Sequence, residues 1–168
     1  VSKLIENNPE HPYSKIGEER FQSLADEALI LLKDSGIPVR GSAERNHYRV
    51  SPMGTLKSTW LTLSDLLISD VENKLPWKRV SIFNAIGFLD FHPRFIADEF
   101  LKLGVESDIH LFNLPELDLL RRNPSEMRST NIARVFEHKE SIEKLIKIIK
   151  ANSKETDAIV LPAIIGLD

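Results

Sequence analysis

One segment of the sequence, residues 79–117, restricts the possible folds more than any other. It begins with RVSIFNAIGFLDF, an almost unbroken apolar run that is typical of a strand covered on both faces. Pro93 then opens a helical pattern that stops at Gly104. The alternating run VESDIHLFNLPEL follows as a second strand. We expect the two strands to pair in parallel through a right-handed crossover.

The carboxyl-terminal part of the sequence extends this pattern. Residues 125–152 are predicted to be helical, and Ser129 or Thr130 could cap the first part. An apolar stripe marks the second part, and the run DAIVLPAIIGL is a third predicted strand. The second half therefore has the order βαβαβ, with helices packed on a parallel sheet. The stripe consists of Ile142, Leu145, Ile146 and Ile149.

The amino-terminal part is predicted to have a different character. Residues 1–17 contain two prolines and two asparagines and are expected to be irregular. Apolar residues recur at helical spacing over residues 18–35, and Gly36 follows as a left-handed cap. Residues 48–50 and 56–63 are predicted to form two strands of a hairpin. The sequence thus predicts an α/β fold, a three-layer-like domain with a small parallel sheet, an amino-terminal helix and a short antiparallel hairpin.

Length and composition exclude several classes of protein. The 168 residues suffice for one domain with a single core, and a net charge of −3 argues against a nucleic-acid binder. The absence of cysteine excludes disulfides and thiolate chemistry within these residues and favours a reducing compartment. No apolar run reaches the roughly 18 residues of a membrane span. Because an apolar strand runs up to the last residues, we expect residues 1–168 to be a single domain excised from inside a longer protein.

The run GTLKST is a candidate anion site. Backbone amides near Gly54 could approach an anion, Lys57 could neutralise it, and Ser58 and Thr59 could donate hydrogen bonds. The spacing of a phosphate-binding P-loop is absent. The alternative is an ordinary turn that leads into an amphipathic strand.

Cations concentrate in the run LRRNPSEMRSTNIAR. Forked guanidinium groups suit phosphate and carboxylate ligands, whereas a solvated loop and helix face balanced by acidic neighbours is the simpler interpretation. Gly87 and Gly166 stand at the ends of two predicted strands, where ligands gather in open α/β sheets and where ordinary turns also occur. The cations are Arg121, Arg122, Arg128 and Arg134.

Metal and catalytic motifs are not apparent. The five histidines are scattered without the short spacing of metal ligands, so no metal site is expected. A Ser-His-Asp grouping cannot be recognised from this one sequence, and no G-x-G-x-x-G run is present. The catalytic residues stay unassigned.

Six short runs together resemble one family. HPY, GTLKSTWL, GFLDF, LPELDLLRRN, NIARVF and LPAIIGL occur in this order and approximate spacing in the B subunit of the anaerobic glycerol-3-phosphate dehydrogenases. The resemblance implies an FMN-associated flavoprotein subunit that takes part in oxidising sn-glycerol 3-phosphate to dihydroxyacetone phosphate. Electrons would pass to quinone in anaerobic respiration. The implied partners are an FAD-containing catalytic subunit and an iron–sulfur membrane-anchor subunit, which would hold the complex at the inner face of the cytoplasmic membrane.

The resemblance also restricts what this segment can do alone. In the family, a nucleotide-binding βαβ unit with a glycine-rich turn precedes the matched region, and more of the flavin domain follows it. This segment is therefore expected to be a cap, a substrate-side domain or part of a flavin domain. We expect it to be inactive alone, and flavin binding by the segment itself stays open.

Three hypotheses follow for the segment. It could line a pocket for the phosphate of the substrate or the flavin, it could dock the other subunits, or it could bind a phosphate metabolite as a free-standing α/β domain. Docking would use exposed apolar residues such as Trp77 and residues 66–68. The phosphate pocket would use Gly54, Lys57, Ser58, Thr59, Arg122 and Arg134.

Overall fold

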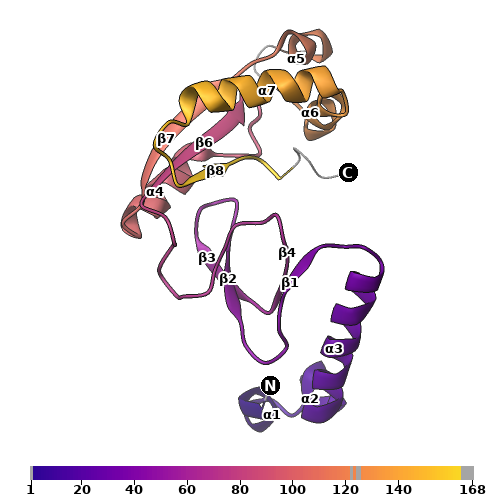
Figure 1. Cartoon of the computed structure of the whole chain (residues 1–168). Coiled ribbons are helices and arrows are strands. Elements are labelled where there is room, and N and C mark those ends of the chain that lie inside the picture. The colour runs from indigo at the N-terminus through magenta and orange to yellow at the C-terminus, as the bar shows by residue number, and fades with distance from the viewer. Residues whose placement is uncertain (1, 122, 124–125, 164–168) are drawn as a thin grey trace. The chain divides into compact units, whose positions relative to one another are not determined.

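A computed structural model describes residues 2–121, 123 and 126–163 of the chain (Figure 1). The chain folds as two compact units. Unit 1 comprises Val1–Arg49 and Lys57–Glu72, and unit 2 comprises Val50–Leu56 and Asn73–Asp168. The turn between two strands of the amino-terminal half thus belongs to the carboxyl-terminal unit. That all 168 residues form one domain of a longer flavoprotein stays a prediction.

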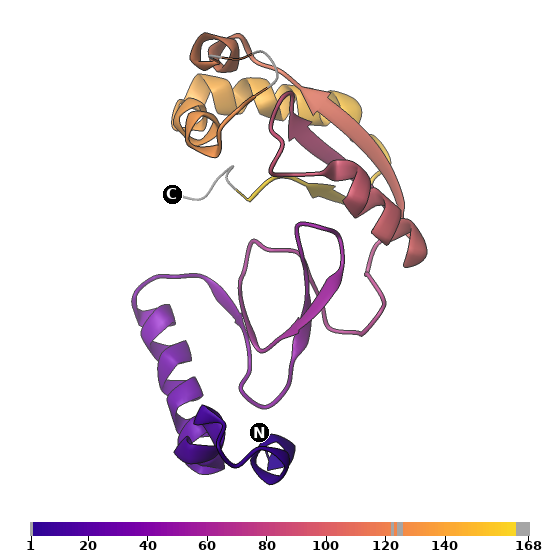
Figure 2. The same ribbon diagram turned by 180° about the vertical axis from the view of Figure 1, so that it is seen from behind.

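Unit 1 begins with three helices, α1 (Ser2–Asn7), α2 (Pro12–Ile16) and α3 (Glu18–Asp34). α1 and α2 lie at the amino-terminal end of α3 (Figures 1 and 2). The prediction of an irregular start was wrong, because Pro12 opens α2 and His11 Nδ1 accepts a hydrogen bond from the Tyr13 N–H at 3.2 Å. The predicted helix over 18–35 is confirmed, and Gly36 follows it with a φ of 75°.

The strands of unit 1 are short. β1 (Val39–Gly41) pairs with β4 (Leu61–Leu63) in antiparallel fashion. β2 (His47–Val50) lies between β3 (Leu56–Thr59) and β5 (Ile68–Ser69). The predicted strand over 56–63 is therefore interrupted at Trp60, where the Thr59 hydroxyl donates to the Leu61 carbonyl at 3.1 Å. The interruption directs the chain from one strand pair to the other.

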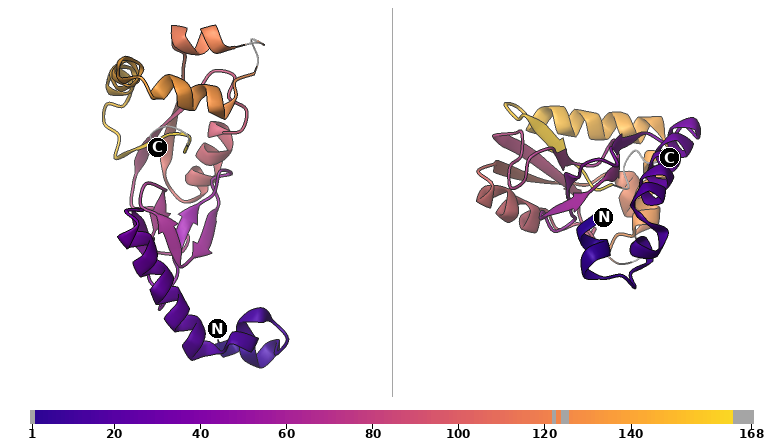
Figure 3. Two further views of the ribbon diagram at one scale, coloured as in Figure 1. Left: turned by 90° about the vertical axis from the view of Figure 1, so that its right-hand side faces the viewer. Right: turned by 90° about the horizontal axis from the view of Figure 1, so that it is seen from below.

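Unit 2 is built on a parallel sheet. β6 (Arg79–Ala85) lies between β7 (Glu106–Phe112) and β8 (Ala158–Val160), and Ile82 is paired with Ile109 on one side and Val160 on the other. The helices are α4 (Pro93–Lys102), α5 (Pro115–Leu120), α6 (Ser129–Phe136) and α7 (Lys139–Asn152). α4 and α7 cover opposite faces of the sheet (Figure 3). This arrangement confirms the predicted α/β fold with its small parallel sheet.

The core of unit 2 explains the apolar run of the central strand. Phe83 and Ala85 face the side of α5–α7 and form a cluster with buried side chains of those helices. Val80 and Ile82 alternate to the other face, which α4 covers with Ile96 and Phe100. β6 is buried on both faces, as a central parallel strand should be. The helix residues of the cluster include Leu117, Ile132, Val135, Phe136 and Leu145.

Three details of the second half differ from the prediction. The strand expected over 105–117 ends at Phe112, and Pro115 opens α5. α6 starts at Ser129 with Arg128 at the N-cap, so neither Ser129 nor Thr130 caps it. Residues 164–168, with Gly166 among them, lie outside the described residues. Among the helices that are described, none combines the length and apolarity needed to cross a membrane.

Candidate functional site

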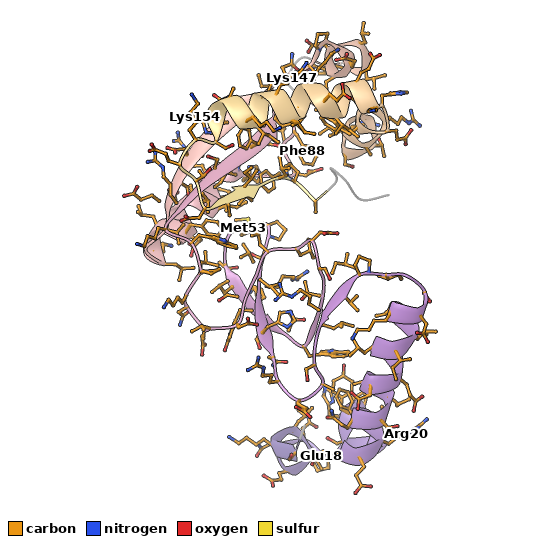
Figure 4. All side chains as sticks on the ribbon, in the orientation of Figure 1. Glu18, Arg20, Met53, Phe88, Lys147 and Lys154 are labelled. Atoms are coloured by element: carbon orange, nitrogen blue, oxygen red, sulfur yellow. The ribbon has the colours of Figure 1, made fainter. Side chains whose placement is uncertain are left out.

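The turn that contains Gly54 packs against helix α4. Gly54 is buried, has a φ of 82°, and donates its N–H to the Ser51 carbonyl at 2.8 Å. A Cβ at this position would lie 2.8 Å from Ile96 Cα and 2.9 Å from Glu99 Cβ. The glycine thus permits a left-handed turn and a close approach of two backbones. Figure 4 labels Met53, the exposed residue beside it in the same turn.

The other residues of the candidate anion run lie on β3 in unit 1. Lys57 and Ser58 are exposed, and the Thr59 hydroxyl is occupied by the Leu61 carbonyl. Because side chains alternate along a strand, Ser58 faces away from Lys57 and Thr59. The structure therefore brings these three residues together on one strand, with Gly54 in the preceding turn.

The candidate arginines lie elsewhere in the fold. Arg134 is an exposed residue in the last turn of α6 in unit 2, where a cation is favoured by the helix dipole. Arg122 lies outside the described residues. Nothing described within either unit joins Arg134 to the residues of β3, so the predicted phosphate pocket stays a prediction.

Arg121 is the most highly organised guanidinium at the carboxyl edge of the sheet. Its side chain is only 9% exposed and forms an ion pair with Asp118 at 3.6 Å. Nη2 donates to the Ile86 carbonyl at 2.8 Å and to Asn113 Oδ1 at 3.4 Å. A Cβ on Gly87, whose φ is 83°, would lie 3.0 Å from Arg121 Nη1. Arg121 and Gly87 together hold the loop that follows β6.

Asn84 fixes the same loop from inside the sheet. Its side chain is buried in β6, and Nδ2 donates to the carbonyls of Phe88 and Phe91, each at 3.0 Å. Oδ1 is buried and accepts no hydrogen bond from the described part of the chain. Sequence reasoning missed this residue, although a lone amide inside an apolar strand is a recognisable signal.

Charged groups at the amino edge of the sheet tie the three strands together. The Asp157 carboxylate accepts the backbone N–H groups of Lys78 at 2.7 Å and Arg79 at 3.0 Å, and these bonds lower the pKa of Asp157. Arg79 binds Asp108 of β7 through Nε and Nη2, at 3.0 and 2.8 Å. These charges stabilise the strand ends. Across the described ranges, no three His, Asp or Glu side chains are grouped to hold a metal ion.

Comparison with known proteins places the chain in a family. A family model described as the FAD binding domain matches residues 1–168. The chain belongs to the FAD binding domain family. This is a family of flavin-binding proteins, and it agrees with the α/β architecture of unit 2. No solved structure matches the chain significantly.

The curated relatives share one name, that of the B subunit of anaerobic glycerol-3-phosphate dehydrogenase. The protein of Yersinia pestis bv. Antiqua is 40% identical over 100% of this chain and 40% of its own length. That of Yersinia enterocolitica is 42% identical with the same coverage, and that of Actinobacillus pleuropneumoniae is 37% identical over 95% of this chain and 38% of its own length. The chain spans about 40% of the length of the curated relatives it matches. These matches confirm the resemblance drawn from the six motifs.

The described residues do not offer a site for the phosphates of a flavin nucleotide. The unit β6–α4–β7 has the required parallel topology, but the loop after β6 holds a single glycine, Gly87, where a dinucleotide turn needs three. Asn84 engages two loop carbonyls, and Pro93 at the start of α4 removes a backbone donor. Phe88, labelled in Figure 4, is buried in the core beside this loop. The loop is thus built for packing.

Proposed function

We propose that this chain is part of a flavin-dependent dehydrogenase subunit that oxidises sn-glycerol 3-phosphate to dihydroxyacetone phosphate, with electrons passed to quinone in anaerobic respiration. The observation that carries the proposal is the 37–42% identity to proteins named as glycerol-3-phosphate dehydrogenase B subunits, over 95–100% of the chain. In the purified complex, sn-glycerol 3-phosphate should reduce a quinone analogue and yield dihydroxyacetone phosphate. A fully assembled complex that turns over another substrate and ignores this one contradicts the proposal.

The proposed cofactor of the whole protein is FMN, held outside the loop after β6. The family model supports a flavin in general, and the motifs resemble an FMN-associated subunit. Chromatography of the flavin released from the denatured whole protein distinguishes FMN from FAD. The 168-residue chain alone should neither bind flavin nor turn over substrate, which a fluorescence titration and a dye-reduction assay test.

The candidate phosphate ligands on β3 are proposed to act in the whole protein. Lys57 is exposed and makes no ion pair with the described residues, so its ammonium is available to a phosphate. Lys57→Ala should raise the KM for glycerol 3-phosphate or weaken flavin binding by about tenfold. Lys147→Ala is the matched control, because Lys147 is an exposed lysine on the solvent side of α7 (Figure 4). Equal and negligible effects of both substitutions would remove Lys57 from the site.

The proposed partners are the FAD-containing catalytic subunit and the iron–sulfur membrane-anchor subunit of the same dehydrogenase. They are supported by the names of the relatives, which describe each as one subunit of a dehydrogenase, and by the motif resemblance. The complex is proposed to lie at the inner face of the cytoplasmic membrane. Co-purification and membrane fractionation with and without the anchor subunit test both statements.

An interaction domain without a catalytic role is the second candidate function. Trp77 and residues 66–68, predicted for docking, are half-buried. Other large apolar side chains of unit 2 are exposed instead, such as Leu101 at 67% and Leu111 at 61%. If docking is the main role, Leu101→Gln should disrupt assembly with the other subunits on a sizing column, whereas Lys147→Gln should not. Intact assembly of both variants contradicts this candidate.

A further inference from the structure

A polar pocket lies within unit 1, away from the run GTLKST. It has a volume of about 170 Å³ and is formed by β1, the turn that follows it, and the adjoining ends of β2 and β5. A cavity of about 150 Å³ admits a molecule the size of benzene, so this pocket can take a small metabolite. Its lining includes Arg40, Ser42, Arg45, His47, Ile68 and Asp70.

The floor of the pocket is anchored by a buried histidine. His47 on β2 is only 7% exposed, and its Nε2 lies 2.7 Å from the hydroxyl of Thr62 on β4. Thr62 in turn is paired with Arg40 on β1. Because Nε2 is occupied, Nδ1 is the ring nitrogen left for a ligand. Burial lowers the pKa of His47 and outweighs the opposing effect of Asp70, so the ring is neutral near pH 7.

Two guanidinium groups stand at the rim without carboxylate partners. Arg40 and Arg45 are exposed, and within the described part of the chain neither makes an ion pair or a hydrogen bond from its side chain. Ser42 lies between them in sequence, and its Oγ accepts the N–H of Glu44 at 3.2 Å, which leaves its own hydrogen to donate. The rim therefore presents forked donors and a hydroxyl to a single small volume.

We propose that this pocket binds a small hydroxylated phosphate monoester. Two guanidinium forks suit the charge and geometry of a phosphate dianion, and the Ser42 hydroxyl adds a neutral donor. Asp70, which carries an acceptor and no donor, suits a hydroxyl group at the other end of the ligand. Glycerol 3-phosphate has both features, so naming it as the ligand rests on the proposed function, whereas phosphate binding itself does not.

A second hollow in the chain has the opposite character. It has a volume of about 490 Å³ in unit 2 and is lined by Glu116, Glu137 and Glu140 beside His138 and Lys139. Lys139 lies 3.9 Å from the carboxylate of Glu143, and Lys144 is paired with Glu116. Its carboxylates repel a phosphate, so the pocket of unit 1 is the better anion site.

The test uses the whole protein and isothermal titration with inorganic phosphate and with glycerol 3-phosphate. Arg40→Gln and Arg45→Gln should each weaken the binding of both ligands about tenfold or more, because each removes a charge-assisted contact to phosphate. Arg49→Gln is the control, since Arg49 is an exposed arginine of β2 outside the pocket. All three positions are exposed, so folding should be retained. Three variants with the same affinities overturn the proposal.

A measurement on the unsubstituted protein gives an independent readout. Titration with inorganic phosphate should shift the NMR resonances of the His47 ring, and unchanged resonances at saturating phosphate overturn the proposal. The outcomes also separate this inference from the proposed function. Arginine-dependent phosphate binding without dehydrogenase activity supports the pocket and refutes the function. Activity that is accompanied by equal affinities in all three variants supports the function and refutes the pocket.

Discussion

Replacing Gly54 by alanine should destabilise unit 2 through a contact that the sequence does not reveal. Two effects add at this position. The φ of 82° is unfavourable for a residue with a Cβ, by about 1–2 kcal/mol. The new Cβ would also lie 2.8 Å from Ile96 Cα and 2.9 Å from Glu99 Cβ on α4, and relieving such overpacking costs about 1–3 kcal/mol.

Gly104 provides a matched control in the same unit. It follows α4 with a φ of 78°, and a Cβ there would meet nothing within 4 Å. Gly104→Ala therefore carries the backbone cost alone, and both substitutions restrict the unfolded chain equally. Their difference in unfolding free energy isolates the contact, and we expect it to be about 1–3 kcal/mol.

Urea unfolding followed by circular dichroism measures this difference. With a slope of about 1–3 kcal/mol per molar urea, the midpoint of the Gly54→Ala variant should lie about 1 M below that of Gly104→Ala. Equal midpoints would refute the close packing of the turn on α4. They would also return Gly54 to the anion-site interpretation, in which its role is to approach a ligand.

Three further predictions concern single side chains. Leu117→Ala should cost about 2–5 kcal/mol in a urea melt because Leu117 is fully buried, whereas Leu119→Ala on the same helix, 85% exposed, should stay within about 0.5 kcal/mol. His47 has a lowered pKa in the folded state, so stability should fall as the pH drops below about 6.5, and melts of His47→Gln should lack this step. Asp157 also has a lowered pKa, so its stabilisation is present above about pH 4 and is lost below it, and Asp157→Asn should be less acid-sensitive than the unsubstituted chain.

The sequence predicted the parts of the fold that local patterns determine. The unit from β6 to β7 follows from a continuous apolar run, a proline at the helix start and an alternating strand. The short helices α1, α2 and α5 were missed, because a proline and a single cap decide them without an apolar periodicity. The interruption at Trp60 was missed because it depends on the pairing of β4 with β1, which lies earlier in the chain.

The candidate site was harder to predict because burial and pairing are tertiary properties. Arg121 and Arg122 are neighbours with equal claims in the sequence, and only the fold shows that Arg121 reaches the carbonyl of Ile86. The role of Gly54 depends on α4, some forty residues further along the chain. The pocket around His47 combines residues from separate strands, so no short motif announces it.

Anaerobic titration of the flavin in the purified whole complex tests the central claim most directly. If the chain is part of a glycerol-3-phosphate dehydrogenase, sn-glycerol 3-phosphate should bleach the absorbance of the oxidised flavin, and dihydroxyacetone phosphate should form in proportion. Glycerol, which lacks the phosphate, should leave the flavin oxidised. A folded, flavin-loaded complex whose flavin stays oxidised at saturating sn-glycerol 3-phosphate would contradict the account.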